Sequence, residues 1–209
     1  LTARAFEPLY GHVSAWRVYN AFGYGLFTGG LSFEEAARHA REHLDIPMSV
    51  VPASNQPGAS FEAAMAQHRR SIELFEPTIL CATPSMAFAL WEEGLLRGFE
   101  ALIIGGEPSS TALRALLKGL GERVVVEVYG LSEIIGPGVA QSCRDGGLHL
   151  NEDAFGVEFL EDELVLSTRH NEAMPRVRYR TGDAVARVSC SCGNTHQAIE
   201  VHGRDQDFI

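Results

Sequence analysis

The sequence contains no long uncharged hydrophobic run and no excess of basic residues. No such run approaches the roughly 20 apolar residues that a membrane-spanning helix requires, and no signal peptide opens the chain. The 209 residues include 17 basic and 27 acidic ones, for a net charge of −10. Nucleic acids and anionic membranes bind basic surfaces, so the charge argues against both as main partners. An anionic nucleotide remains compatible, because local dipoles and a metal ion can hold it.

Cysteine is also scarce, with four residues in the chain. This is far below the density of a disulfide-stabilised scaffold, so we expect a cytoplasmic protein with reduced thiols. Apolar residues make up 45% and charged residues 21% of the sequence, which is typical of a globular protein with a buried core. The chain begins at Leu1 inside an expected helix (residues 1–10) and ends at Ile209 without a terminating signal, which predicts a fragment of a longer protein.

Short apolar runs alternate with helical patterns in the first part of the chain. Runs rich in β-branched residues predict buried strands at residues 48–51, 78–81, 101–104 and 124–128. Apolar residues at helical spacing predict helices around residues 33–44, 61–75, 88–95 and 113–120, the last with Ser109 or Ser110 as N-cap. This alternation favours an α/β fold with a mostly parallel sheet and helices on its faces.

The pattern changes after about residue 145. Short runs separated by turn signals follow, at residues 157–160, 163–167, 176–179, 185–188 and 198–202. No long helical period remains there, which predicts a small antiparallel β-rich subdomain. We therefore expect two parts, an α/β core of residues 1–145 and a β-rich subdomain of residues 146–209.

Two polar loops follow the last two expected strands. Gly105-Gly106-Glu107-Pro108 follows residues 101–104, and Tyr129-Gly130-Leu131-Ser132-Glu133 follows residues 124–128. Ligands of open parallel sheets bind beyond the carboxyl ends of the strands, so both loops would face one crevice if the strands are neighbours. There Tyr129 could stack on a base, and Glu133 would be a hard oxygen ligand suited to Mg²⁺. Taken alone, both loops also fit turns and helix caps.

Five segments carry recognisable motifs in a fixed order. They are NAFGYGLFTGG (residues 20–30), YGLSE (129–133), IIGPGVA (134–140), YRTGD (179–183) and Gly203-Arg204 followed by Asp207. Together they resemble motifs of the phenylacetate–CoA ligase family of the adenylate-forming superfamily. The resemblance implies part of the large N-terminal domain of such an enzyme. Residues 1–145 would then bind nucleotide and acid, and residues 146–209 would end at the hinge to a C-terminal domain.

The resemblance also implies an activity and a nucleotide site. An aryl or arylacetic acid would be activated with ATP to an acyl-adenylate, and coenzyme A would then displace AMP. Glu133 (holding Mg²⁺), Ser132 (touching phosphate) and Arg204 (near ribose and phosphate) would form the catalytic set. The nucleotide would be bound by Gly106, Glu107 and Pro108 on the adenine side, Tyr129 and Gly130 against the base, and Asp183 at the ribose hydroxyls.

The acid would occupy an apolar pocket, according to the same resemblance. Its expected lining residues are Tyr24, Phe27, Gly30, Ile135 and Pro137. Two segments depart from the family pattern. Gln206 stands where Asp or Lys is common two residues after the hinge arginine, and residues 32–45 differ from the expected glycine-rich continuation. The family's phosphate loop would precede Leu1 and its catalytic lysine would follow Ile209, so we expect this chain alone to bind nucleotide weakly and to catalyse nothing.

Several alternatives remain open. An adenylating enzyme could pass the acyl group to a carrier protein or another nucleophile, and a non-catalytic zinc-stabilised module could retain the crevice. Gly23, Gly25 and Gly29 with Asp45 suggest a dinucleotide fingerprint, although the glycine spacing is one residue too long. The oligomeric state is open, with a homodimer among the options.

A second group of residues suits a metal. Cys143, His149, Cys190 and Cys192 supply three thiolates and one imidazole, a closed tetrahedral set for structural Zn²⁺ that leaves no catalytic position open. Related ligases of this branch can carry such a set. The alternatives are a reduced Cys-x-Cys turn, a strained disulfide, or His196 as the fourth ligand. Cys81 lies within an expected strand and is predicted to be an inert core thiol.

Overall fold

The computed structural model describes residues 1–209 except 25–27, 54–59, 109–122, 135 and 205–209. The helical elements are the 3-10 helix η1 (Thr2–Leu9) and the α-helices α1 (Thr28–His43), α2 (Phe61–Phe75) and α3 (Pro84–Glu92). The strands are β1 (Arg17–Asn20), β2 (Ser49–Pro52), β3 (Ile79–Ala82), β4 (Ala101–Gly105), β5 (Val124–Leu131), β6 (Gly136–Ser142), β7 (Leu148–Leu150), β8 (Phe155–Leu160), β9 (Glu163–Thr168), β10 (Tyr179–Val188) and β11 (Ala198–Arg204). Within the described ranges, no helix combines the length and apolar character needed to cross a membrane.

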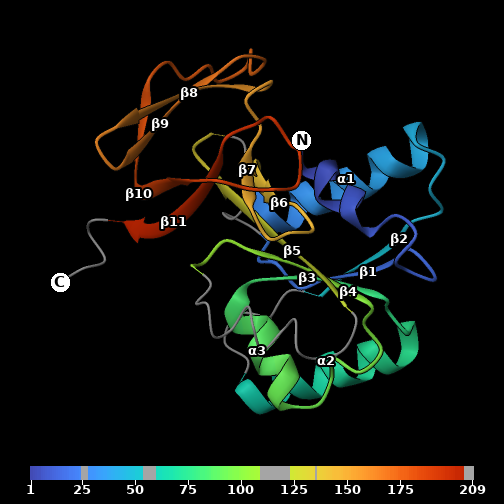
Figure 1. The fold of residues 1–209 in the computed structure, drawn as a ribbon. Coiled ribbons are helices and arrows are strands. Elements are labelled where there is room, and N and C mark those ends of the chain that lie inside the picture. Colours follow the sequence, from blue (N-terminus) through green and yellow to red (C-terminus); the bar gives the residue numbers. More distant parts are fainter. Residues whose placement is uncertain (25–27, 54–59, 109–122, 135, 205–209) are drawn as a thin grey trace.

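The described strands form one sheet in the order β2-β1-β3-β4-β5-β6-β7-β11-β10-β9-β8. The pairings from β2 to β5 are parallel, and those from β5 to β8 are antiparallel. Figure 1 shows β8 to β11 above the parallel strands, so the sheet curls over on itself. The predicted fold class, a mostly parallel α/β sheet followed by an antiparallel β-rich part, is confirmed.

Helices cover both faces of the parallel half (Figure 1). On one face, η1 and α1 pack Phe6 and Phe33 against Ile79. On the other face, α2 and α3 pack Met65 and Leu90 against the strand residues that alternate with those of the first face, such as Leu80. Successive strand residues point to opposite faces, and both faces are buried, which explains the continuous apolar runs that predicted these strands.

A third apolar cluster fills the antiparallel half. It joins Leu131 and Val139, from β5 and β6, with Leu164 and Val185, from β9 and β10. Its members lie on both sides of residue 145. The two-part division at that residue stays a prediction.

Several elements differ from the sequence expectation. No strand is predicted at residues 17–20, yet β1 lies between β2 and β3; its Asn20 is fully buried and donates to the Gly30 carbonyl oxygen at 2.8 Å. The helix expected at residues 1–10 is the 3-10 helix Thr2–Leu9. The strand expected at residues 176–179 begins only at Tyr179, because Arg178 has a left-handed φ of 48°. The helix expected at residues 113–120, with its N-cap at Ser109 or Ser110, lies outside the described residues.

Candidate functional site

An open cleft of about 1340 Å³ lies where the carboxyl ends of β4 and β5 face the β10–β11 hairpin. Glu107 follows β4, Glu133 follows β5, and Asp183 lies on β10; all three line the cleft. The first two come together because β4 and β5 are parallel neighbours. The other predicted site residues that line it are Gly106, Pro108, Tyr129, Gly130, Ser132, Pro137 and Arg204.

Asp183 is the most enclosed acidic group of the cleft, with 6% of its surface exposed. Its Oδ2 accepts a hydrogen bond from the Tyr129 hydroxyl at 2.5 Å, and its Oδ1 accepts one from Arg204 Nε at 3.0 Å. Arg204 lies directly opposite Asp183 in the β10–β11 ladder, whereas Tyr129 reaches across from β5. Both carboxylate oxygens are thus held in place by residues of the cleft itself.

The protonation states of these partners follow from burial and charge. Burial, with the neighbouring Asp183 carboxylate second, raises the pKa of Tyr129 far above its usual value, so the hydroxyl remains a donor. The hydrogen bond to Asp183 is the main cause that raises the pKa of Arg204, and Glu133 adds to it through its charge. The cleft therefore contains a permanently cationic guanidinium between two carboxylates.

Glu107 has a structural role that the sequence did not reveal. Its carboxylate accepts hydrogen bonds from the backbone N–H of Ser85 at 3.1 Å and from the Ser85 hydroxyl at 2.9 Å. Ser85 lies in the first turn of α3, next to the N-cap Thr83, where backbone donors lack partners within the helix. Glu107 thus fixes the loop after β4 to α3. The Thr83-Pro84-Ser85 segment is a helix-start signal in the sequence, but it does not indicate the contact with Glu107.

The turn after β5 exposes Ser132 and Glu133 to the cleft. Arg176 Nε donates to the Glu133 main-chain oxygen at 3.2 Å, and Thr28 Oγ1 lies 3.2 Å from Ser132 Oγ. Close backbone packing explains the glycine of the motif, since a Cβ on Gly130 would lie 1.9 Å from the Gly136 carbonyl oxygen. Thr28 and Arg176 are contributors that sequence reasoning missed.

The expected acid pocket is only partly visible. Pro137 lines the cleft, together with Phe22, Thr28 and Gly29. Tyr24 and Gly30 are absent from the described lining residues. Tyr24 instead packs on Gly30, where a Cβ would lie 2.9 Å from the Tyr24 ring, and donates to Glu34 at 2.7 Å. Phe27 and Ile135 lie outside the described residues, as do Gly25, Gln206 and Asp207.

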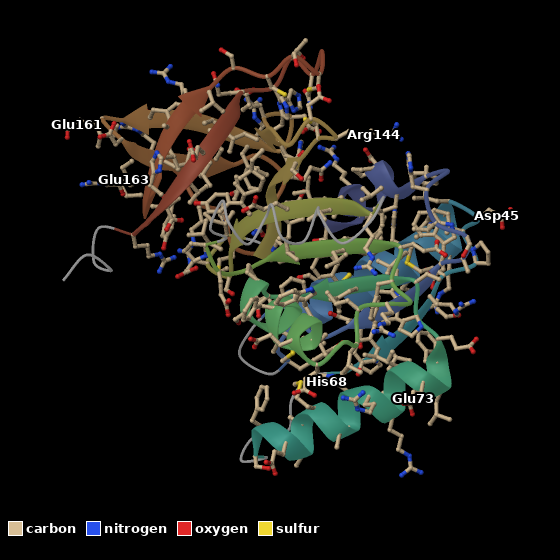
Figure 2. The ribbon with its side chains drawn as sticks, turned by 60° about the horizontal axis from the view of Figure 1, so that its bottom comes forward. Asp45, His68, Glu73, Arg144, Glu161 and Glu163 are labelled. Atoms are coloured by element: carbon tan, nitrogen blue, oxygen red, sulfur yellow. The ribbon has the colours of Figure 1, made fainter. Side chains whose placement is uncertain are left out.

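The dinucleotide alternative is wrong. Asp45 follows the C-terminal end of α1, while Gly29 lies in its first turn. At 1.5 Å per residue the two ends of the helix are roughly 24 Å apart. Figure 2 shows Asp45 at the periphery of the molecule, so it cannot share a ribose with the glycines.

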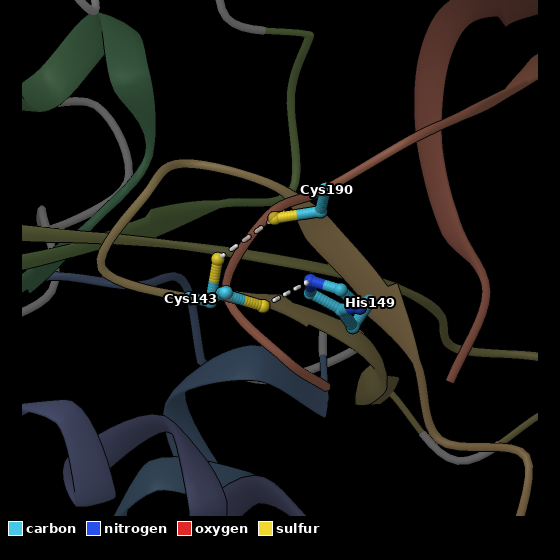
Figure 3. A group of neighbouring side chains, drawn as sticks. Cys143, His149 and Cys190 are labelled. Atoms are coloured by element: carbon cyan, nitrogen blue, oxygen red, sulfur yellow. Dashed lines mark hydrogen bonds between the residues drawn. The ribbon is translucent and has the colours of Figure 1, made fainter. Parts of the chain in front are cut away.

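The predicted metal ligands come together beside the cleft. The side-chain ligand atoms of Cys143, His149, Cys190 and Cys192 all lie within 4.8 Å of one another. Cys143 Sγ is 3.6 Å from Cys190 Sγ (Figure 3). Cys192 Sγ is 3.3 Å from His149 Nε2. His196 does not belong to this group; its carbonyl oxygen lies 2.8 Å from His149 Nδ1.

These distances fit a tetrahedral zinc ion. With Zn–S of about 2.3 Å and Zn–N of about 2.0 Å, ligand atoms at tetrahedral corners are roughly 3.5–3.8 Å apart. The His196 carbonyl would accept from His149 Nδ1–H, which leaves Nε2 free to coordinate. The pKa of Cys190 is lowered to about 6, chiefly by the backbone N–H of Cys192 and then by His149, whereas the pKa of Cys192 is raised. The fit to a metal therefore rests on the ligand types and their distances. Cys81 is fully buried and burial raises its pKa, which agrees with an inert core thiol.

Solved structures share this fold. The 2-hydroxyisobutyryl-CoA ligase in complex with 2-HIB-AMP and CoA aligns with a TM-score of 0.77 at 18% identity, over 97% of this chain and 48% of that one. The anthranilate CoA ligase in complex with anthranoyl-AMP aligns with a TM-score of 0.62 at 16% identity, over 99% of this chain and 43% of that one. The fold is that of adenylate-forming CoA ligases.

Sequence relatives narrow the class further. The chain is 36% identical to the phenylacetate-coenzyme A ligase of Thermus thermophilus, 33% to that of Aromatoleum evansii and 30% to that of Escherichia coli. Each match covers 92% of this chain and 46% of the relative, so the chain spans about half the length of these curated relatives. No family model matches it. Over that shared half, the chain is a homologue of the phenylacetate-coenzyme A ligases, as its motifs indicate.

Proposed function

We propose that this chain forms the nucleotide- and acid-binding part of an AMP-forming acid–thiol ligase. Such an enzyme activates an aryl or arylacetic acid with ATP and transfers the acyl group to coenzyme A. The observation that carries the proposal is the convergence of Glu107, Glu133 and Asp183 on one cleft. Homology to phenylacetate-coenzyme A ligases over the same residues supports it. The activity itself belongs to a protein of about the relatives' length.

The proposed reaction has two steps. The substrate carboxylate attacks the α-phosphorus of ATP, which releases pyrophosphate and leaves an acyl-adenylate; the thiol of coenzyme A then displaces AMP. Both partners of the first step are anions, so positioning and charge neutralisation are the main tasks of the protein. Asp183 would accept hydrogen bonds from the ribose hydroxyls, and Arg204 would turn its charge toward the phosphate.

The remaining roles follow from where each group lies. Tyr129 and Gly130 would contact the base, with Gly106, Glu107 and Pro108 on the adenine side. Glu107 would contribute through its backbone, because its carboxylate accepts hydrogen bonds from Ser85. Ser132 would touch phosphate. Glu133 would hold Mg²⁺, which neutralises phosphate oxygens when bound.

The acid would enter beside Pro137 and Phe22, two apolar residues of the described lining. Tyr24 and Gly30 would then shape the pocket from behind, through their packing at the start of α1. An aromatic ring suits such a surface. A cytoplasmic location would suit the free cysteines.

Nucleotide binding tests this proposal directly. Isothermal titration of the purified chain with AMP should give weak, saturable binding. Asp183→Asn should weaken it by about 1–3 kcal/mol, because a buried acceptor of ribose hydroxyls is lost. Asp162→Asn, in the exposed turn between β8 and β9, is the matched control. Equal affinity in the two variants would refute the assigned role of Asp183, and pyrophosphate–ATP exchange by this chain at the rate of an intact ligase would refute the expected need for further segments.

The Cys143–His149–Cys190–Cys192 cluster would hold a structural Zn²⁺. Three thiolates and an imidazole complete its coordination, so the ion would stabilise the fold rather than react with substrate. Metal analysis of the purified chain should find about one zinc per molecule. Cys190→Ser and His149→Ala should each lose most of it, whereas Cys81→Ala should keep it. Unchanged zinc in both ligand variants would exclude the site.

A further inference from the structure

The sheet has a narrow junction between β7 and β11. Strands β5, β6 and β7 form one antiparallel set, and β11, β10, β9 and β8 form the next. The β7–β11 ladder comprises two residue pairs, Ala198↔His149 and Ile199↔Leu148. The neighbouring β10–β11 ladder comprises six. Few backbone hydrogen bonds therefore join the two sets, and one of them runs from Leu150 N to Gln197 O at 3.0 Å.

The two walls of the cleft rest on opposite sides of this junction. Tyr129 lies on β5 and Glu133 in the turn that follows it, whereas Asp183 and Arg204 lie on β10 and β11. A rotation at the β7–β11 pairing would change the distance from Tyr129 to Asp183. The β7–β11 pairing is thus one of the contacts that set the geometry of the cleft, together with the apolar cluster that the two sets share.

The metal cluster bridges the same junction. Cys143 and His149 come from the end of β6 and from β7, whereas Cys190 and Cys192 come from the loop that joins β10 to β11. His149 is itself one of the two residues that pair with β11. The two turns are in direct contact, because a Cβ on Gly147 would lie 2.7 Å from Cys190 Sγ. Gly147 and Cys190 also line the cleft.

We infer that metal bound by these four residues locks the β7–β11 junction and so holds the two cleft walls at the separation that nucleotide binding needs. The ion would join Cys143 and His149, on one side of the junction, to Cys190 and Cys192 on the other. These bonds would reinforce a ladder of only two residue pairs. Metal binding and nucleotide binding are then coupled, and the coupling is reciprocal. This inference rests on both the metal site and the nucleotide site of the proposed function, and the exchange measurement tests the lock without nucleotide.

Cys192→Ala is the sharpest variant, because Cys192 is a cluster residue that is absent from the described cleft lining. Thr195→Ala is its control: it lies in the same loop, is exposed and belongs to neither site. Zinc content, amide hydrogen exchange and AMP affinity are measured on the zinc-loaded chain and both variants. Removing zinc from the parent chain with a chelator, and then restoring it, gives the same comparison without a substitution.

We expect zinc loss in Cys192→Ala to speed exchange at the β7 and β11 amides at least about tenfold, with β3 and β4 unchanged. The AMP dissociation constant should rise about tenfold, and Thr195→Ala should match the parent. Unchanged exchange at β7 and β11 after zinc loss would overturn the lock, as would equal loss of protection in β3 and β4. Unchanged AMP affinity would overturn the coupling. A zinc-loaded parent that binds no AMP would refute the proposed function, while the exchange data would still decide the lock.

Discussion

At the scale of single residues, Asp183 organises the cleft through Tyr129 and Arg204. The Tyr129 hydroxyl is a partly buried donor to a carboxylate, a kind of hydrogen bond that contributes about 1.5–3 kcal/mol. Tyr129→Phe should therefore lower the free energy of unfolding by about that amount, as measured by urea denaturation. Tyr179→Phe is the control, because the described residues show no hydrogen bond from the Tyr179 hydroxyl. Equal effects of the two variants would mean that the Tyr129–Asp183 contact contributes little.

The residues of the site could be predicted from sequence only where a motif fixes them to the end of a strand. Tyr129, Glu133 and Asp183 meet this condition, and the cleft brings them together. Thr28, Ser85 and Arg176 could not be predicted, because their contacts with Ser132, Glu107 and Glu133 depend on tertiary packing. Tyr24 stays a prediction for the acid pocket; its hydroxyl contacts Glu34 and Asn20, which the motif alone does not reveal.

At the scale of elements, η1 is attached to the antiparallel half by an ion pair. Arg4 contacts Asp153 at 2.5 Å, and its hydrogen bond to that carboxyl lowers the pKa of Asp153 from 3.8 to about 2. A lowered folded-state pKa means that the contribution is present above pH 3.8 and is lost as the pH falls toward 2. The side chains of Arg4 and Asp153 are 33% and 47% exposed, so solvent screening limits the contribution of this ion pair to stability to about 0.2–1 kcal/mol.

Asp153→Asn should consequently destabilise the chain near neutral pH. The stability difference between variant and parent should shrink as the pH falls through about 2. Denaturant midpoints measured across this range would show the difference between parent and variant shrinking with acid. Asp162→Asn serves as the control, since its carboxylate is exposed in the turn between β8 and β9. A difference that stays constant from neutral pH to pH 2 would exclude the ion pair as its cause.

The elements that sequence predicted best are those with uniform burial. Strands β3 and β4 are buried at every position, so a plain apolar run identifies them. Strand β1 has only four residues, two of which are Arg17 and Asn20. It pairs in parallel with both β2 and β3, but its two apolar residues are too few to give a strand pattern. The strand predicted at residues 176–179 is wrong for a different reason: Arg178 has a left-handed φ, so β10 begins only at Tyr179.

At the scale of the whole molecule, the continuous sheet and the third apolar cluster predict cooperative unfolding. The two tryptophans, Trp16 and Trp91, both lie in the parallel half, so their fluorescence reports that half, whereas far-UV circular dichroism reports the entire sheet. With zinc present, the two urea transitions should coincide. After zinc removal, the circular dichroism should begin to change at lower urea than the fluorescence. Two separate transitions in the zinc-loaded chain would support independent folding of the two predicted parts instead.

The hydrogen bonds of Asp183 have a consequence for how ligand analogues should be read. Each of its oxygens already accepts a hydrogen bond within the cleft, so an incoming sugar competes with a phenol and a guanidinium for the lone pairs of this carboxylate. The measured affinity is then the balance of an exchange, not a sum of newly formed contacts. A deoxy analogue would leave the Tyr129 or the Arg204 hydrogen bond to Asp183 intact. Its loss of affinity should therefore be smaller than the number of missing hydroxyls suggests.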